Sequence, residues 1–207
     1  DRWGAVTRSG ANIGLAFDNE DLGFYGDFGF YYYDGENVKG NQMVQANFGA
    51  YLRPIHRDQT ILQTGVNVGY SSFDDNLSKF TYGHGGYFSP QSYVSLAFPI
   101  NYSEKYKKLS WNAGASLGFQ SYSVASAAYF PTLAYEQRWL DILAESGGIT
   151  ESRYKSESES GFGMNLGAGM RYELSPALSI GSRISYDTFG DYSETSAVIN
   201  FLYNTDP

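Results

Sequence analysis

Between Gly161 and Glu173 the sequence reads GFGMNLGAGMRYE, and its residues alternate strictly between two kinds. Every second position from Phe162 to Tyr172 carries an apolar side chain, and the positions between them carry glycine, asparagine and arginine. Successive side chains of a β-strand point to opposite faces, so this segment predicts a strand with one apolar face and one small, polar face. Strands of this kind, repeated along a chain, are typical of a barrel that meets lipid outside and water inside.

The same alternation recurs along the chain. Phe48 and Ala50, for example, share one face of their segment, while Asn47 and Gly49 share the other. We expect the small inward side chains to leave a water-filled lumen with space for something to pass. The nine predicted strands are 5–17, 22–33, 42–52, 60–72, 91–102, 109–120, 162–173, 178–188 and 195–203.

Composition excludes several other classes. The 207 residues have a mean hydropathy of -0.37 and no apolar run near 20 residues, which excludes transmembrane helices but not a membrane barrel. The 19 tyrosines suit aromatic belts at the two membrane interfaces. Cysteine is absent, and no sequence motif indicates a metal, nucleotide or other cofactor, so we expect none. The net charge of -8 resides mainly in turns, and no basic stripe indicates a nucleic-acid partner.

Short and long connections alternate, as periplasmic turns and external loops do in bacterial outer-membrane barrels. The short connections are Asp18–Asp21, Arg53–Asp58, Ser103–Lys108 and Leu174–Ala177. The long ones are Phe73–Pro90 and Ser121–Gly161, with Asp34–Gly40 and Phe189–Glu194 only modestly long.

This phase has a consequence for the strand count. If the last strand descends to the periplasm, the first strand begins outside, so at least one strand should precede it. An odd count also conflicts with the even number that is usual in these barrels, and open sheet edges do not persist in hydrocarbon. We therefore expect residues 1–207 to be the C-terminal part of a larger outer-membrane barrel; a missed or split strand is the alternative.

The second long connection has helical character. Its middle reads TLAYEQRWLDILAESGG, in which Leu133, Leu140 and Leu143 share a face, Pro131 marks the entrance and Gly147 the stop. We expect this helix to pack over the barrel mouth, either as a simple cover or as a lid.

One region resembles a known family. Tyr82–Tyr102 reads YGHGGYFSPQSYVSLAFPINY, YKKLSWNAGASLGFQSY follows, and Tyr129 to Pro131 form a Tyr-Phe-Pro step before the helical segment. These residues resemble the C-terminal outer-membrane domain of cellulose synthase operon protein C. The resemblance covers most of the chain, most distinctively Phe80–Pro131.

The resemblance implies an all-β, antiparallel transmembrane barrel of about 16 strands in the outer membrane of a Gram-negative bacterium. It implies export of cellulose, which periplasmic tetratricopeptide repeats receive from the inner-membrane cellulose synthase complex. The expected partners are therefore a cellulose chain, outer-membrane lipid and that complex, the last through repeats that this chain lacks.

Moving a neutral glucan requires polar groups for its hydroxyls, rings for its flat sugar faces, and many weak contacts. The uncharged inward candidates are Asn47, Tyr51, Asn67, Tyr93, Asn101, Asn112, Gln120 and Asn165. The charged ones, Arg171, Arg183 and Asp187, either brace the wall as an ion-pair network or contact sugar. Two inward acids against two inward arginines give no bias toward a cationic polymer, which favours neutral cellulose over poly-N-acetylglucosamine.

The loop Phe80–Pro90 is the candidate gate. Its aromatic and histidine residues stand among glycines, which permit backbone conformations that other residues avoid. We expect it to close the external mouth and stack on emerging sugar; a fixed plug or a crossover to a neighbouring loop is the alternative. The gate residues are Tyr82, Gly83, His84, Gly85, Gly86, Tyr87 and Phe88.

Three other functions compete with export. An enzyme would need His56, in the expected turn RPIHRD, or His84, which lies near Ser89; a hydrolase requires a positioned serine, histidine and orienting group, so we expect no catalytic residue. A soluble ligand-holding barrel would turn its apolar face inward. The few charges on the polar face argue against it. An adhesive or structural barrel without transport is the third.

Overall fold

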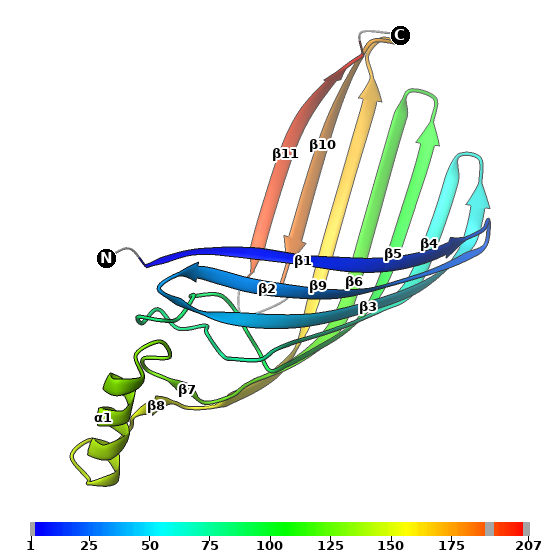
Figure 1. Cartoon of the computed structure of the whole chain (residues 1–207). Helices are drawn as coiled ribbons and strands as arrows, with labels where there is room; N and C mark the ends of the chain where they lie inside the picture. The colour runs from blue at the N-terminus through cyan, green and yellow to red at the C-terminus, as the bar shows by residue number, and fades with distance from the viewer. Residues whose placement is uncertain (1–2, 189–192, 205–207) are drawn as a thin grey trace.

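The chain folds into one curved antiparallel sheet of nine strands, seen in a computed structural model that describes residues 3–188 and 193–204 (Figure 1). The strand order is β1-β2-β3-β4-β5-β6-β9-β10-β11, and β7 and β8 form a separate two-stranded ribbon. The elements are β1 (Gly4–Asp18), β2 (Leu22–Glu36), β3 (Val38–Arg57), β4 (Thr60–Phe73), β5 (Ser92–Tyr106), β6 (Leu109–Val124), β7 (Ala127–Ala128), α1 (Ala134–Glu145), β8 (Arg153–Tyr154), β9 (Glu157–Glu173), β10 (Leu178–Asp187) and β11 (Glu194–Tyr203).

All nine predicted strands are present and occur in the predicted order. The sheet is curved but open, because β1 and β11 are its two edges and do not pair with each other within the described residues. The molecule is thus a curved section of antiparallel wall rather than a closed barrel. That further strands complete the wall stays a prediction.

Strand β9, which contains the alternating segment Gly161–Glu173, pairs with β6 over nearly its whole length. Phe162 lies opposite Phe119, and their rings meet edge to face at 5.4 Å. On the other face of the same strands, Gly163 lies opposite Gly118. Bulky residues therefore meet bulky residues across the sheet, and small residues meet small ones, which gives the two faces their different character.

The strands extend further than the sequence pattern predicts at the end that carries the long connections. The expected loop Asp34–Gly40 is wrong: β2 and β3 run on to a tight connection at Asn37, which adopts a φ of 56°. Likewise β6 continues to Val124 and β9 starts at Glu157, so the long connection between them is shorter than expected. The expected connection Phe189–Glu194 lies mostly outside the described residues.

At the opposite end, the expected turn Arg53–Asp58 is also wrong, because β3 continues to Arg57 and contains His56. Pro54 lies at a shift in the β3–β4 register, between Leu52 and Ile55. Proline cannot donate to a ladder, so it occurs in strands at such irregularities.

The predicted helix is confirmed as α1, with Ser146 as its C-cap and Gly147 following at a φ of 76°, a conformation that suits glycine after a helix. Figure 1 shows α1 at the far end of the β7–β8 ribbon, clear of the sheet. That it packs over the barrel mouth stays a prediction, because the described sheet is open. No helix in the described part of the chain is both long and apolar enough to cross a membrane.

The buried apolar core is concentrated at one end of the sheet, where residues 74–91 pack. Its members are Val38, Met43, Phe73, Leu77, Val124 and Ala127. We call this end, which carries residues 74–91 and α1, the loop end, and the end with the short connections the turn end.

Candidate functional site

The eleven residues predicted to line a lumen all lie on one face of the sheet. The strand register places Asn47 opposite Gly69, Gln63 opposite Asn101, and Asn165 opposite Asp187, so the polar positions of neighbouring strands stay in phase. We call this the inner face. Its predicted members are Asn47, Tyr51, Asn67, Tyr93, Asn101, Asn112, Gln120, Asn165, Arg171, Arg183 and Asp187.

The inner face is the concave one. Residues 74–91 pack against it, since Tyr87 stacks on Tyr33 with ring centroids 4.9 Å apart, and Figure 1 places this segment in the hollow of the sheet. The opposite, outer face carries the large apolar side chains: Phe48 is 51% exposed, Leu117 65% and Phe162 87%. The predicted sidedness is therefore confirmed.

Several glycines of the inner face do not leave the open space that the sequence predicts. Their room is taken by side chains of neighbouring strands that lie flat on the wall. A Cβ on Gly114 would stand 2.5 Å from Asn101 Oδ1, and one on Gly169 would stand 2.7 Å from Asn112 Oδ1. The glycines thus allow amide side chains to lie against the sheet, which shapes the wall more than it widens the lumen.

Hydrogen bonds between side chains fix several inner-face residues. Asn47 Nδ2 donates to both carboxylate oxygens of Asp27, at 3.0 and 3.2 Å, and Asn165 Nδ2 donates to Asp187 Oδ2 at 2.8 Å. Tyr25 donates to Asn67 Oδ1 at 2.9 Å. Asparagine amides therefore donate hydrogen bonds to two carboxylates of the inner face, those of Asp27 and Asp187.

The expected ion-pair network of Arg171, Arg183 and Asp187 is wrong. Four residues separate Arg183 from Asp187 along β10, which is about 13 Å in a strand. The aspartate therefore lies toward the loop end, whereas both arginines lie toward the turn end. Among the described residues, no salt bridge involves either arginine.

A charged cluster that the sequence did not predict lies at the turn end of β3. Arg53 Nη1 donates a hydrogen bond to Asp18 Oδ1 at 2.8 Å, and the hydroxyl of Tyr51 donates one to the same oxygen at 2.9 Å. Arg53 Nε also donates to Gln63 Oε1 at 3.2 Å. The alternation that places Tyr51 inward continues to Arg53, and extending it by two residues would have found this cluster.

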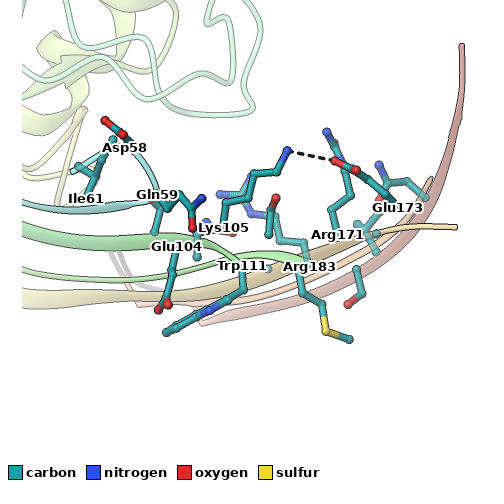
Figure 2. A pocket seen from close by; sticks show the side chains of 18 residues that line it. Asp58, Gln59, Ile61, Glu104, Lys105, Trp111, Arg171, Glu173 and Arg183 are labelled. Carbon is teal, nitrogen blue, oxygen red and sulfur yellow. Dashed lines mark hydrogen bonds and ion pairs between the residues drawn. The ribbon is translucent and has the colours of Figure 1, made fainter. Parts of the chain in front are cut away.

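A cavity of about 910 Å³ opens on the inner face at the turn end, between β3 and β11 (Figure 2). In Figure 2 Arg171 and Lys105 rise on the concave side, while Trp111 points to the opposite side. Lys105 Nζ forms an ion pair with Glu173 Oε1 at 3.2 Å. A smaller cavity of about 480 Å³ adjoins Asp18 and Arg53.

The loop end of the inner face is occupied by aromatic rings of the predicted gate. Besides its stack on Tyr33, Tyr87 lies 5.7 Å from the ring of Phe73. Phe88 meets Tyr122 and Tyr93 edge to face, at 5.0 and 6.2 Å. The predicted gate segment therefore lies on the concave wall and contacts β2, β4, β5 and β6.

Backbone bonds also attach this segment to its neighbours. Lys39 N donates to Gly83 O at 2.9 Å, and Gly85 N and Gly86 N both donate to Leu77 O at 3.1 Å. Gly83 and Gly86 have φ angles of 92° and 67°, which side chains with a Cβ rarely adopt. The glycines thus permit the folded-in path that the sequence predicted.

His84 is fully buried at the centre of these contacts. Its Nε2 lies 2.8 Å from the carbonyl oxygen of Ala128, its own carbonyl accepts a bond from Trp3 Nε1 at 3.0 Å, and its ring meets Tyr154 edge to face. Nδ1 is buried without a hydrogen-bond partner in the described structure. Burial lowers the pKa of the imidazole, because a charged ring would lose its hydration.

The geometry does not favour the hydrolase alternative. Ser89 Oγ accepts a bond from Leu77 N at 2.7 Å and donates to Tyr87 O at 3.2 Å, while His84 Nε2 binds Ala128. Both groups thus serve the packing of the loop. A triad needs the base to contact the nucleophile.

Comparison with known proteins agrees with this fold. Residues 1–206 match the family model for the C-terminus of cellulose synthase operon protein C. The chain belongs to this family. It is 35% identical to cellulose synthase operon protein C of Xanthomonas axonopodis pv. citri (strain 306), over 95% of this chain and 14% of that protein. It is 32% identical to cellulose synthase 2 operon protein C of Komagataeibacter xylinus, over 99% of this chain and 15% of that protein.

A solved structure of a bacterial polysaccharide outer membrane secretin shares the fold, with a TM-score of 0.53 over 95% of this chain and 55% of that chain. Its sequence identity is 13%, so the likeness concerns the fold alone. The chain spans about one seventh of the length of the two relatives.

Proposed function

We propose that this chain forms part of an outer-membrane pore that exports a neutral exopolysaccharide, cellulose, from the periplasm to the cell exterior. The observation that carries the proposal is the sidedness of the sheet: a convex apolar face and a concave face of amides, tyrosines and glycines. In this orientation the turn end faces the periplasm and the loop end faces the exterior.

The outer face supports a lipid environment. Large side chains such as Phe98, Leu117 and Ile184 are more than half exposed on it. Leaving one such side chain in water costs about 1.5–3 kcal/mol relative to burying it. A soluble ligand-holding barrel would hide these side chains in its interior, and here the interior of the curve is the polar face.

The inner face supports passive movement of an uncharged chain. Its amides can exchange hydrogen bonds with sugar hydroxyls, and rings such as Tyr93 and Phe88 offer flat surfaces for sugar faces. Asp27 and Asp187 of the inner face already accept amide hydrogen bonds, so these two carboxylates offer less to a cationic glucosamine polymer. Guidance by many weak contacts requires no catalytic residue in this region.

Residues 80–90 serve, in this proposal, as the external gate. They lie on the concave wall at the loop end, and their aromatic contacts with Tyr33 and Tyr122 hold them there. A chain emerging from the pore would have to displace them or stack on their rings. The partners remain those that the family suggests: the glucan, outer-membrane lipid and, through a periplasmic repeat region elsewhere in the protein, the inner-membrane synthase complex.

The sidedness can be tested with single cysteines, since this chain contains none. Asn112→Cys would place a thiol on the inner face, and the adjacent Ala113→Cys would place one on the outer face as a matched control. In full-length protein freed of any other cysteine, a bulky, membrane-impermeant thiol reagent should label the first and not the second. Labelling of the first should also stop secretion of cellulose by cells that carry it.

Two results would contradict the proposal. Equal labelling of both positions would remove the assignment of faces. Labelling of Asn112→Cys without any loss of secretion would mean that the polymer does not pass along this wall.

A further inference from the structure

Two arginines at the turn end of the inner face lie side by side, with no counter-ion among the described residues. Arg171 of β9 lies opposite Gly181, and Arg183 of β10 lies opposite Gly169, so the two are diagonal neighbours on adjacent strands. Within the described residues neither takes part in a salt bridge. Like charges so placed repel each other, and an anion between them would relieve that repulsion.

Other cations of the inner face differ in this respect. Arg53 pairs with Asp18 at 2.8 Å, and Lys105 pairs with Glu173 at 3.2 Å. The guanidinium of Arg8 lies over the ring of Tyr31, 3.5 Å from its centroid. Each of these cations therefore has a partner, whereas the arginine pair has no ion-pair partner in the part of the wall that the structure describes.

Two asparagines complete the surroundings of the pair. The register across β6, β9, β10 and β11 gives two neighbouring rows, one reading Asn112, Gly169, Arg183 and the other Arg171, Gly181, Asn200. In each row the asparagine lies over the glycine, since a Cβ on Gly181 would stand 2.5 Å from Asn200 Oδ1. Each row thus combines a guanidinium with an amide, and both groups supply N–H donors.

All four side chains line the cavity of about 910 Å³ (Figure 2). Three acids also line the cavity: Asp58, Glu104 and Glu173. Glu173 is paired with Lys105, Glu104 accepts a hydrogen bond from Tyr102 at 2.8 Å, and Asp58 lies at the opposite end of the cavity from the arginines in Figure 2. The part of the cavity next to β9 and β10 is therefore cationic, rich in donors and open to solvent.

We propose that Arg171, Arg183, Asn112 and Asn200 form a binding site for an oxyanion carried on the exported polysaccharide. A planar guanidinium matches a carboxylate or a phosphate with two parallel hydrogen bonds, and two guanidiniums can clamp one such group. The entrance of the pore then accepts a glucan that bears carboxylate or phosphate substituents, in addition to unsubstituted cellulose. This inference rests on the proposed export function.

The site has one competitor. A carboxylate from another part of the full-length protein can occupy it as a fixed counter-ion. In that case the site takes no oxyanion from the polymer, and the experiment below separates the two outcomes.

The test uses full-length protein in planar lipid bilayers, with cellohexaose and carboxymethylated cellohexaose added to the side of the turn end. We expect the anionic oligosaccharide to block the ion current about tenfold longer than the neutral one, in keeping with a charge-assisted bidentate contact. In Arg171→Gln/Arg183→Gln the two residence times should become equal. Lys107→Gln, which removes a charge from the neighbouring turn outside the cavity, should leave the tenfold ratio intact.

Two additional arms keep the result interpretable. Arg171→Lys/Arg183→Lys keeps both positive charges but lacks the bidentate guanidinium, so it should retain only part of the tenfold ratio of residence times. Its insertion into the bilayer also shows that a double variant at these positions can fold. Inorganic phosphate should shorten the block by the anionic oligosaccharide if a free oxyanion competes for the same site.

Equal residence times in the unaltered protein, or a ratio that persists in Arg171→Gln/Arg183→Gln, would overturn the inference. Loss of block by the neutral oligosaccharide as well would instead count against the export function. The two failures are therefore distinguishable.

Discussion

The two ends of the inner face differ in how their side chains are satisfied. At the loop end, residues 74–91 cover the wall, and rings such as Tyr87 and Tyr33 stack on each other. At the turn end a cavity of about 910 Å³ opens on the wall, and neither Arg171 nor Arg183 forms a salt bridge with any residue that the structure describes. If the chain is the export pore that we propose, closure and acceptance of the polymer belong to separate sets of residues at opposite ends of the same strands.

The largest effect is expected from deletion of Gly83–Phe88, which tests whether the loop end closes the pore. The deletion removes the rings that rest on the wall, so single-channel conductance of the full-length protein should rise by at least about twofold. The matched control deletes α1, Ala134–Glu145, which stands clear of the sheet and should leave conductance unchanged. An unchanged conductance after the first deletion would show that the loop end does not close the pore.

An intermediate effect is expected from pH. His84 is neutral when the loop is packed, because burial holds its pKa below the ordinary value of about 6.5. An open loop exposes the ring and binds the proton more readily, so the packed state loses stability as the pH falls through 6.5. The open fraction should rise by at most about tenfold per pH unit between 6.5 and the lowered pKa.

Single-channel recordings at external pH of about 7.5 and about 5.5 would measure that fraction. Among the described residues, the nearby charge of Lys79 also lowers the pKa of His84, whereas the hydrogen bond to Ala128 O raises it by less than burial lowers it. His84→Gln should abolish the pH response, whereas His56→Gln, an exposed histidine in β3 at the turn end, should keep it. A response that survives in His84→Gln would assign the titration to another group.

The smallest effect concerns the wall itself. Gly169→Ala would force Asn112 from its place and should destabilise the barrel by roughly 1–3 kcal/mol. Gly167→Ala is the matched control on the same strand and face, because the nearest atom to its new Cβ would be Ile184 O at 3.8 Å. That change should be neutral or stabilising by up to about 1 kcal/mol.

The temperature at which the barrel of the full-length protein loses its heat-modifiable gel shift would compare the two variants. If both variants shift it equally, the amide does not depend on the glycine beneath it.

The strands and their faces were predictable from sequence because a period of two encodes sidedness directly, as in β9. The strand ends were not. Beyond the lipid the outer face no longer needs apolar residues, yet the hydrogen-bond ladder continues, so β3 reaches Val38 where the pattern stops at residue 42. Apolar alternation indicates the part of a strand that has an apolar surface, and it does not indicate the residue at which the strand ends.

The same limit applies to the site. Which residues face inward follows from alternation within one strand, but which residues touch depends on the register between strands. Asp187 was expected near Arg183 and instead binds Asn165, because the register aligns it with that asparagine. Arg53 was assigned to a turn because the apolar alternation ends at Leu52, whereas β3 continues to Arg57.

The length of β3 has a mechanical consequence. Its 20 residues span roughly 66 Å, while about 9–11 tilted residues suffice to cross the hydrocarbon of a bilayer. In the proposed pore, the loop end of β3, where the Lys39 amide binds Gly83 O, would extend past the hydrocarbon of the bilayer. If residues 80–90 act as the proposed gate, this attachment makes their movement depend on the surrounding aqueous medium rather than on bilayer thickness.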